Sequence, residues 1–223
     1  MTQDAPLPGE LPPSLRTARR IAVVGSPGAG KTTLARQLAG VTGLPLVHLD
    51  DLHWLPDWRR PDRARWQRIQ AEAAAADRWI IDGHYENDLS IRLRHADVAV
   101  VVDSGRLRCL LRVLWRGGRI RTGSRELLPL RIRQQAKDGV RVAAHADLSR
   151  LVRTVLAYRM DRCLRTVTAA RTHDGSPLAV VVVRPHTPTR RRLVRRAARS
   201  HFTFTVVVAT PAASSAAPKE PAP

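Results

Sequence analysis

The chain has 223 residues, 43% of them hydrophobic, which suits one globular domain with a sizeable core. Its formal net charge is +19 and nearly all of its basic residues are arginine, so either it binds anionic partners or its composition is biased. The absence of a long apolar run, together with only two distant cysteines, argues against membrane spanning, export, a disulfide framework and a zinc site, and predicts a cytoplasmic protein.

The two ends of the chain differ in composition from its middle. Residues 1–18 are rich in proline and polar residues without a period, which predicts a disordered leader. We expect the main domain to span residues 19–200. Residues 201–223 predict a low-complexity tail, although 202–208 alternates like a strand that the sequence alone does not place.

The first strand of the domain, residues 21–24, leads directly into the pattern Gly-x-x-x-x-Gly-Lys-Thr. Its glycines let the backbone turn N–H groups inward to hold phosphate oxygens, and the helix over about 31–41 adds its positive end. A plain glycine turn is the alternative, but both the required strand and the required helix are present. The predicted phosphate-binding residues are Gly25, Ser26, Pro27, Gly28, Ala29, Gly30, Lys31, Thr32 and Thr33.

Three side chains of this segment have separate expected roles. Lys31 reaches the β- and γ-phosphates of a nucleoside triphosphate, and Thr32 offers its hydroxyl to Mg²⁺. Thr33 adds a hydroxyl near the α-phosphate. The expected cofactors are therefore ATP and Mg²⁺.

A second strand over residues 44–49 runs into Asp50, which places a carboxylate where open α/β sheets bind ligands. Asp50 is the candidate to orient or deprotonate an acceptor hydroxyl; with a phosphate or carboxylate acceptor it would instead bind substrate or a metal-bound water. Trp54 and Trp58 follow, ahead of a helix over 62–76. They predict either the aromatic walls of an acceptor pocket or a loop anchored on the core.

A third strand over residues 78–83 contains Asp82 near its end. An aspartate there is often only a turn or cap residue, but beside a phosphate loop it can hold Mg²⁺ together with Thr32, directly or through water. In the next short segment, Arg92 is expected to face the same cleft. A fourth strand over 96–103 is nearly all apolar, as is typical of a central parallel strand.

A helix beginning near Leu107 carries Arg112, Arg116 and Arg119 at spacings of four and three, which places them on one face. Like charges so placed repel by roughly a few tenths of a kcal/mol per pair unless an anion lies between them. Either they form a solvated basic face, or Arg116 and Arg119 act on the transferring phosphate while Arg112 supports nucleotide binding. The glycine-containing stretch 117–146 predicts a mobile lid.

The remaining elements complete an α/β pattern. We expect one long helix over residues 147–171, a fifth strand over 178–183, and a final basic helix over about 187–199. The loop over 184–187 is expected near the base of the nucleotide.

This combination resembles the bacterial adenylate-kinase-like P-loop proteins often labelled DNA topology modulation protein (FlaR-related). The likeness covers residues 20–120 well and 147–199 loosely. It implies an α/β P-loop NTPase with a five-stranded parallel sheet flanked by helices, as in adenylate kinases, and phosphoryl transfer to a small acceptor. The residues that carry it are Gly25–Ala35, His48-Leu49-Asp50 with Leu52, Trp54, Pro56 and Trp58, Trp79–Gly83 with Tyr85, and Arg92-Leu93 with Ala96-Asp97.

The resemblance also suggests the acceptor side of the site. Asp82-Gly83 looks like the Asp-Gly that opens the acceptor-binding segment of adenylate kinases, but His84-Tyr85-Glu86 replaces the Phe-Pro-Arg that follows there, which disfavours AMP. The predicted acceptor-binding residues are Asp50, Trp54, Trp58, Gly83, Tyr85 and Arg92.

Two functions are compatible with this pattern. The first is an ATP-dependent kinase for a nucleoside, nucleotide or similar small acceptor. The second is an ATP-binding regulatory protein that contacts DNA, which the family label and the +19 charge favour. No recognisable DNA-binding module is present in the sequence, so we expect only weak, non-specific nucleic-acid binding.

Overall fold

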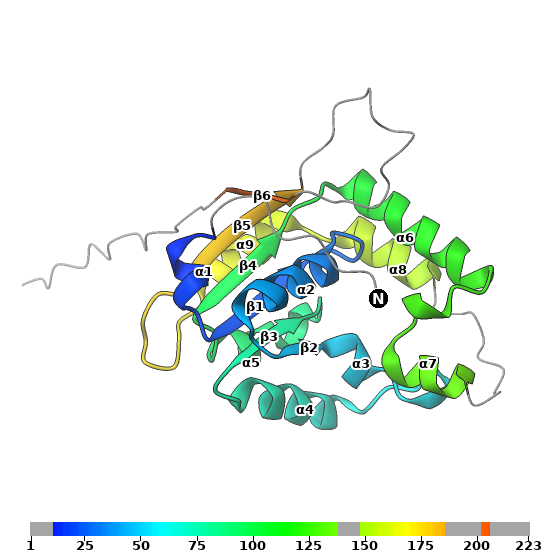
Figure 1. Cartoon of the computed structure of the whole chain (residues 1–223), viewed down its shortest axis with the longest axis horizontal. Helices are drawn as coiled ribbons and strands as arrows, with labels where there is room; N and C mark the ends of the chain where they lie inside the picture. Colours follow the sequence, from blue (N-terminus) through cyan, green and yellow to red (C-terminus); the bar gives the residue numbers. More distant parts are fainter. Residues whose placement is uncertain (1–10, 138–147, 186–201, 206–223) are drawn as a thin grey trace, which may run out of the picture.

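The computed structural model describes residues 11–137, 148–185 and 202–205, and every structural statement concerns these residues. One sheet has the strand order β2-β3-β1-β4-β5-β6 (Figure 1). The first five strands in that order pair in parallel, which confirms the expected five-stranded parallel sheet. The strands are β1 (Arg20–Gly25), β2 (Leu46–His48), β3 (Trp79–Asp82), β4 (Val98–Val102), β5 (Ala179–Pro185) and β6 (Phe202–Thr205).

Helices cover both faces of the sheet, which is why its central strands are almost entirely apolar. Successive residues alternate between two cores, so that Val23 packs on one face while Ala22 and Val24 pack on the other. The first face is covered by α1 (Pro13–Thr17), α2 (Lys31–Thr42), α6 (Arg106–Arg121) and α8 (Leu148–Ala157). The second is covered by α3 (Leu49–His53), α4 (Arg63–Ala75), α5 (Leu89–Leu93) and α9 (Met160–Ala169).

The remaining described elements contribute no residue to either core. They are the 3-10 helices η1 (Pro56–Trp58), η2 (Glu86–Asp88) and η3 (Arg125–Leu127) and the helix α7 (Leu130–Lys137). Within the described ranges, no helix has both the length and the apolar character needed to cross a bilayer.

The N-terminal segment differs from the predicted leader. Residues 11–18 belong to the folded domain, because Leu15 is completely buried and Leu11 is nearly so, both in the core that α2 also lines. Proline at the start of α1 suits a first helical turn; Leu15 lies within α1, whereas Leu11 precedes the helix, and both pack in the same core. The prediction of a disordered leader is thus wrong for 11–18, and residues 1–10 lie outside the described part.

The predicted long helix over 147–171 is two helices, α8 and α9, separated by Tyr158 and Arg159. Arg159 has extended backbone angles (φ −116°, ψ 105°). Val155 of α8 packs in the core on one face of the sheet, whereas Val167 of α9 packs in the core on the other. The helix must break because one straight helix cannot cover both faces.

The C-terminal part of the chain differs from the prediction in one respect, because a strand lies in the range predicted as a tail. The strand-like alternation after residue 201 includes β6, which pairs antiparallel with β5, with Phe204 opposite Val183. The domain therefore extends beyond residue 200, into the range predicted as a tail. The basic helix expected over 187–199 and the residues after 205 lie outside the described part.

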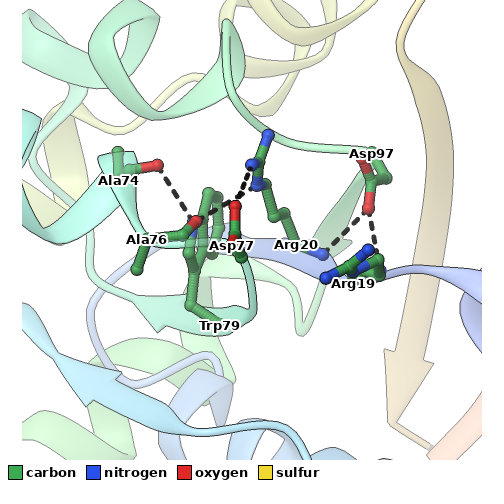
Figure 2. A network of polar contacts seen from close by, with 7 residues as sticks. All are labelled: Arg19, Arg20, Ala74, Ala76, Asp77, Trp79 and Asp97. Carbon is green, nitrogen blue, oxygen red and sulfur yellow. Dashed lines mark hydrogen bonds and ion pairs between the residues drawn. The ribbon is translucent and has the colours of Figure 1, made fainter.

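A polar network ties the elements together where β1 begins (Figure 2). Backbone N–H groups of Arg19 and Arg20 donate to one carboxylate oxygen of Asp97, at 2.8 and 2.9 Å. The Arg20 side chain pairs with Asp77 at 3.3 Å, and the Trp79 indole N–H donates to a carbonyl oxygen of α4 at 3.1 Å. This network joins the starts of β1, β3 and β4, so the opposite, carboxyl ends of the strands are left for the candidate site.

Candidate functional site

The phosphate loop connects β1 to α2 as expected. Gly25, Gly28 and Gly30 have φ values of +146°, +78° and +100°, which side chains rarely allow. A Cβ on Gly25 would lie 2.6 Å from the Val102 carbonyl oxygen, and one on Gly28 would collide with the Cys109 carbonyl oxygen. The loop therefore needs glycine both for its conformation and for its close approach to β4 and α6.

Lys31 lies at the end of this loop and is only 9% exposed. Its Nζ donates to the Ser26 carbonyl oxygen at 2.9 Å, so the ammonium group is held over the loop. Burial lowers the pKa of Lys31, and the charges of Asp82 and Asp50 oppose that shift while Arg116 adds to it. The charges of the groups predicted for the metal, the acceptor and the clamp thus all act on this buried cation.

Thr32 and Asp82 meet as predicted. The hydroxyl of Thr32 donates to Asp82 Oδ2 at 2.7 Å, and Nδ1 of His48 lies 3.2 Å from the same oxygen. Because β2, β3 and β1 are neighbours in the sheet, Asp82 lies opposite His48 on one side and Val23 on the other. Parallel register therefore brings the end of β3 beside the phosphate loop.

One carboxylate oxygen of Asp82 has no hydrogen-bond partner in the described part of the chain, and this bears on whether the site can bind a cation. Asp82 is 4% exposed, and its Oδ1 is buried without a hydrogen-bond partner among the described residues. Burial would raise the pKa of Asp82, but contacts with His48, Lys31 and Thr32 outweigh it and lower the pKa. An ionised carboxylate with one free oxygen beside a threonine hydroxyl fits Mg²⁺, which prefers few protein oxygens plus phosphate and water.

The predicted acceptor residues from two parts of the chain come together. The Tyr85 hydroxyl donates to Asp50 Oδ1 at 2.8 Å, and burial followed by the charge of Asp50 raises the pKa of Tyr85. The Tyr85 ring lies 4.7 Å from the ring of Trp66, and Trp54 and Trp58 meet edge to face at 5.3 Å. Trp54 and Trp58 are half-buried, so they both pack on neighbours and leave part of each ring exposed.

Arg92 is 1% exposed and lies behind Tyr85. One of its nitrogens donates to the Tyr85 carbonyl oxygen at 3.5 Å, while Nε and Nη1 are buried without a partner in the described chain. Burial lowers its pKa to about 10, against the opposing charges of Asp82 and Tyr85, so the side chain keeps its charge at neutral pH. The expectation that Arg92 faces an open cleft is therefore wrong for this conformation, because the side chain is covered.

Gly83 has a structural reason to be glycine. A Cβ there would lie 2.8 Å from side-chain atoms of Leu49, at the start of α3. Its small size thus lets β3 and α3 pack closely. Direct contact with an acceptor remains a prediction for this residue.

The three arginines predicted to share one face of α6 have different surroundings. Arg112 donates to the carbonyl oxygens of Gly28 and Ala29 at 3.3 and 3.2 Å. Arg116 is half-buried and close enough to Lys31 to lower the pKa of Lys31. Arg119 donates to Ser124 and Glu126 on the surface, over the Trp115 ring, so the structure does not bring it to the phosphate loop.

Three residues at the site were not predicted as functional. His48 holds Asp82, the Ser104 hydroxyl donates to the Ala29 carbonyl oxygen at 2.5 Å, and His84 Nδ1 lies 3.2 Å from the Gly25 carbonyl oxygen. Burial, aided by the charge of Lys31, lowers the pKa of His84 to about 4, so its ring is neutral at pH 7. Each follows or ends a strand at the carboxyl edge, and that position was the available signal.

Helix α7, in the stretch predicted as a lid, lies beside η1 and α3 (Figure 1). The backbone N–H of Leu130 donates to Asp51, and Gln135 exchanges two hydrogen bonds with Asp57. Asp57 and the following residue, Trp58, have φ of +58° and +57°, a conformation that costs roughly 1 kcal/mol per non-glycine residue. The described part of the stretch is therefore held against the acceptor side, while its mobility stays a prediction.

The phosphate loop and the strand order of this chain define a P-loop α/β protein. No family model matches the sequence and no curated protein does, so the likeness to DNA topology modulation proteins stays a prediction.

Solved kinase structures share part of the arrangement. A shikimate kinase from Acinetobacter baumannii in complex with shikimate is 19% identical, with 72% of this chain and 86% of that chain covered and a TM-score of 0.43. A gluconokinase from Sinorhizobium meliloti 1021 is 21% identical, with 62% and 89% covered and a TM-score of 0.34. Scores this low describe a similarity of arrangement only, so the function of this chain must be argued from its own residues.

Proposed function

We propose that this protein is an ATP-dependent phosphotransferase that moves the γ-phosphate of ATP to a small acceptor such as a nucleoside, a nucleotide or a similar compound. The observation that carries the proposal is the contact between Thr32 and Asp82 beside Lys31. A glycine loop alone could be structural. A loop whose threonine meets a buried, ionised aspartate with a free oxygen supports Mg²⁺–triphosphate binding.

Phosphoryl transfer depends mainly on positioning and on neutralising charge. In the proposed mechanism, Lys31 leaves the Ser26 carbonyl and binds the β- and γ-phosphates, and Arg116 meets the charge on the transferring group. Thr32 and Asp82 would hold Mg²⁺, whose charge lowers the repulsion between the phosphates and an incoming oxygen. Thr33 remains our proposed contact near the α-phosphate.

The acceptor would bind beside Asp50, Tyr85 and the exposed parts of Trp54 and Trp58. Asp50 would orient an acceptor hydroxyl, or accept its proton, while Tyr85 keeps the carboxylate in place. Arg92 is buried next to Tyr85, stays charged at neutral pH and has two nitrogens without hydrogen-bond partners among the described residues, so it adds positive charge to this side. We therefore propose an acceptor that carries an anionic group as well as the receiving oxygen.

A screen with labelled ATP, Mg²⁺ and a panel of nucleosides, nucleotides and sugar acids tests the proposal. We expect label in one acceptor class, and we expect Lys31→Met to lower that turnover by about a thousandfold, because it removes a cation aimed at the transferring phosphate. A circular-dichroism melt serves as the folding control. Equal turnover in folded wild type and Lys31→Met would contradict the assignment of the loop.

A further inference from the structure

Arg112 and Ser104 hold the phosphate loop from its outer side. Arg112 Nη1 lies 3.3 Å from the Gly28 carbonyl oxygen and 3.2 Å from that of Ala29. The hydroxyl of Ser104, which is buried, donates to the same Ala29 oxygen and lies 3.5 Å from Arg112 Nη1. The Ala29 carbonyl therefore accepts from two side chains, one of them cationic.

The direction of these contacts follows from the shape of a phosphate loop. A loop that turns N–H groups inward, toward phosphate, must turn carbonyl groups outward, and buried carbonyls need donors. In a trans peptide the C=O of Ala29 and the N–H of Gly30 point in opposite directions. The Gly30 N–H is therefore the donor that the Ala29–Gly30 peptide unit can present to a ligand, whereas the Ala29 N–H, in the preceding unit, bonds to the Ser26 carbonyl oxygen.

A cation on the carbonyl end of a peptide polarises the whole unit and makes its N–H a stronger donor. Arg112 is half-buried, and burial, followed by repulsion from Arg108, lowers its pKa. Partial burial reduces screening by water, so the charge acts more strongly on the peptide than a surface arginine would. The charge of Arg112 would thus favour phosphate binding without touching the nucleotide.

Helix α6 makes this contact rigid. A Cβ on Gly28 would meet the Cys109 carbonyl oxygen and lie 3.1 Å from a methyl group of Val113, so loop and helix are in direct contact. We propose that Arg112, supported by Ser104, is a positioning residue that fixes and polarises the phosphate loop from its carbonyl side. This inference rests on the proposed nucleotide-binding function and gives the expected support of nucleotide binding by Arg112 a specific form.

Hydrogen exchange of loop amides in the ligand-free protein separates the two roles. Positioning predicts that Arg112→Met raises exchange at residues 26–31 by about tenfold, as expected for loss of hydrogen bonds to a charged group, before any nucleotide is added. Ser104→Ala should have a smaller effect of the same sign, and Arg112→Lys should restore part of the protection. Arg119→Met is the matched control, because Arg119 is bound to Ser124 and Glu126, away from the loop.

Calorimetric titration with a non-hydrolysable ATP analogue and Mg²⁺ completes the test. We expect roughly tenfold weaker binding by Arg112→Met and less than a twofold change in Arg119→Met. Weaker binding with unchanged loop exchange would overturn the inference in favour of direct contact. If the wild type binds no analogue while loop exchange still depends on Arg112, the positioning role stands and the proposed function fails.

Discussion

The hydroxyl of Thr32 lies 2.7 Å from a carboxylate oxygen of Asp82, although 50 positions separate the two residues in the chain. Parallel pairing of β1 with β3 produces this contact, since Val23 is opposite Asp82 and the phosphate loop begins two residues later. The same carboxylate is held by His48, at the end of β2. The start of α2, the end of β2 and the end of β3 therefore meet at the buried carboxylate of Asp82.

The first prediction concerns this carboxylate. Asp82→Asn removes the negative charge but keeps the shape, so we expect the Mg²⁺ concentration needed for half-maximal turnover to rise roughly 10- to 100-fold. A magnesium titration at saturating ATP measures it. Asp103→Asn, in an aspartate that follows β4 and pairs with Arg184, is the control. A wild-type titration curve for Asp82→Asn would assign the metal to another carboxylate, such as Asp50.

The second prediction separates two arginines of α6. Arg116 is half-buried and its charge lowers the pKa of Lys31, whereas Arg119 is bound to Glu126 on the surface. Arg116→Met should lower kcat by about 100-fold with little change in the KM for ATP, because the interaction develops in the transition state. Arg119→Met should stay within about twofold of wild type, as expected for an exposed ion pair. Steady-state kinetics of both variants test this prediction. Equal losses of kcat would instead favour a clamp shared by the two arginines.

The third prediction concerns the buried charge of Arg92. Two nitrogens of this buried guanidinium lack hydrogen-bond partners among the described residues, so an apolar side chain of similar length removes a desolvation cost, and Arg92→Met should keep the melting temperature of the wild type or raise it. For an anionic acceptor we expect the KM to rise roughly tenfold, from loss of one charge acting over several ångströms. The KM for ATP should not change. A large fall in melting temperature would instead show that Arg92 stabilises the fold.

The fourth prediction distinguishes an enzyme from a regulatory protein that contacts DNA. Non-specific DNA binding by a chain of charge +19 should fall with salt, with a log-log slope of about −0.9 per phosphate contacted. We expect retention at low salt only, independent of Lys31 and without stimulation of ATP turnover. Charge reversal at Arg195 and Arg196, in the basic helix predicted over about 187–199, should abolish retention and spare turnover. Filter binding that is tight, sequence-selective and ATP-dependent at physiological salt would favour the regulatory function.

Much of the phosphate-binding half could be predicted from local sequence. A glycine-rich loop between an apolar strand and a helix is a short-range signal, because the conformation of each glycine and the start of the helix depend on near neighbours. The contact between Thr32 and Asp82 could also be predicted, since the carboxyl ends of neighbouring parallel strands share one edge. Strand boundaries shifted by only a few residues.

Only the tertiary structure decided which groups each arginine of α6 contacts. Helical spacing placed Arg112, Arg116 and Arg119 on one face, but Arg112 donates to the phosphate loop and Arg119 to the segment after α6, while the charge of Arg116 repels that of Lys31. Such contacts depend on how one element packs against another, which no local period encodes.

The burial of Arg92 and the break between α8 and α9 at Tyr158 both result from the packing of helices against the sheet. The sequence by itself determined the chemistry available at the carboxyl edge of the sheet, because the residue types at the ends of the strands set it. Only the packing of helices on both faces of the sheet decided which of those groups are buried, which are paired, and which remain free to bind a ligand.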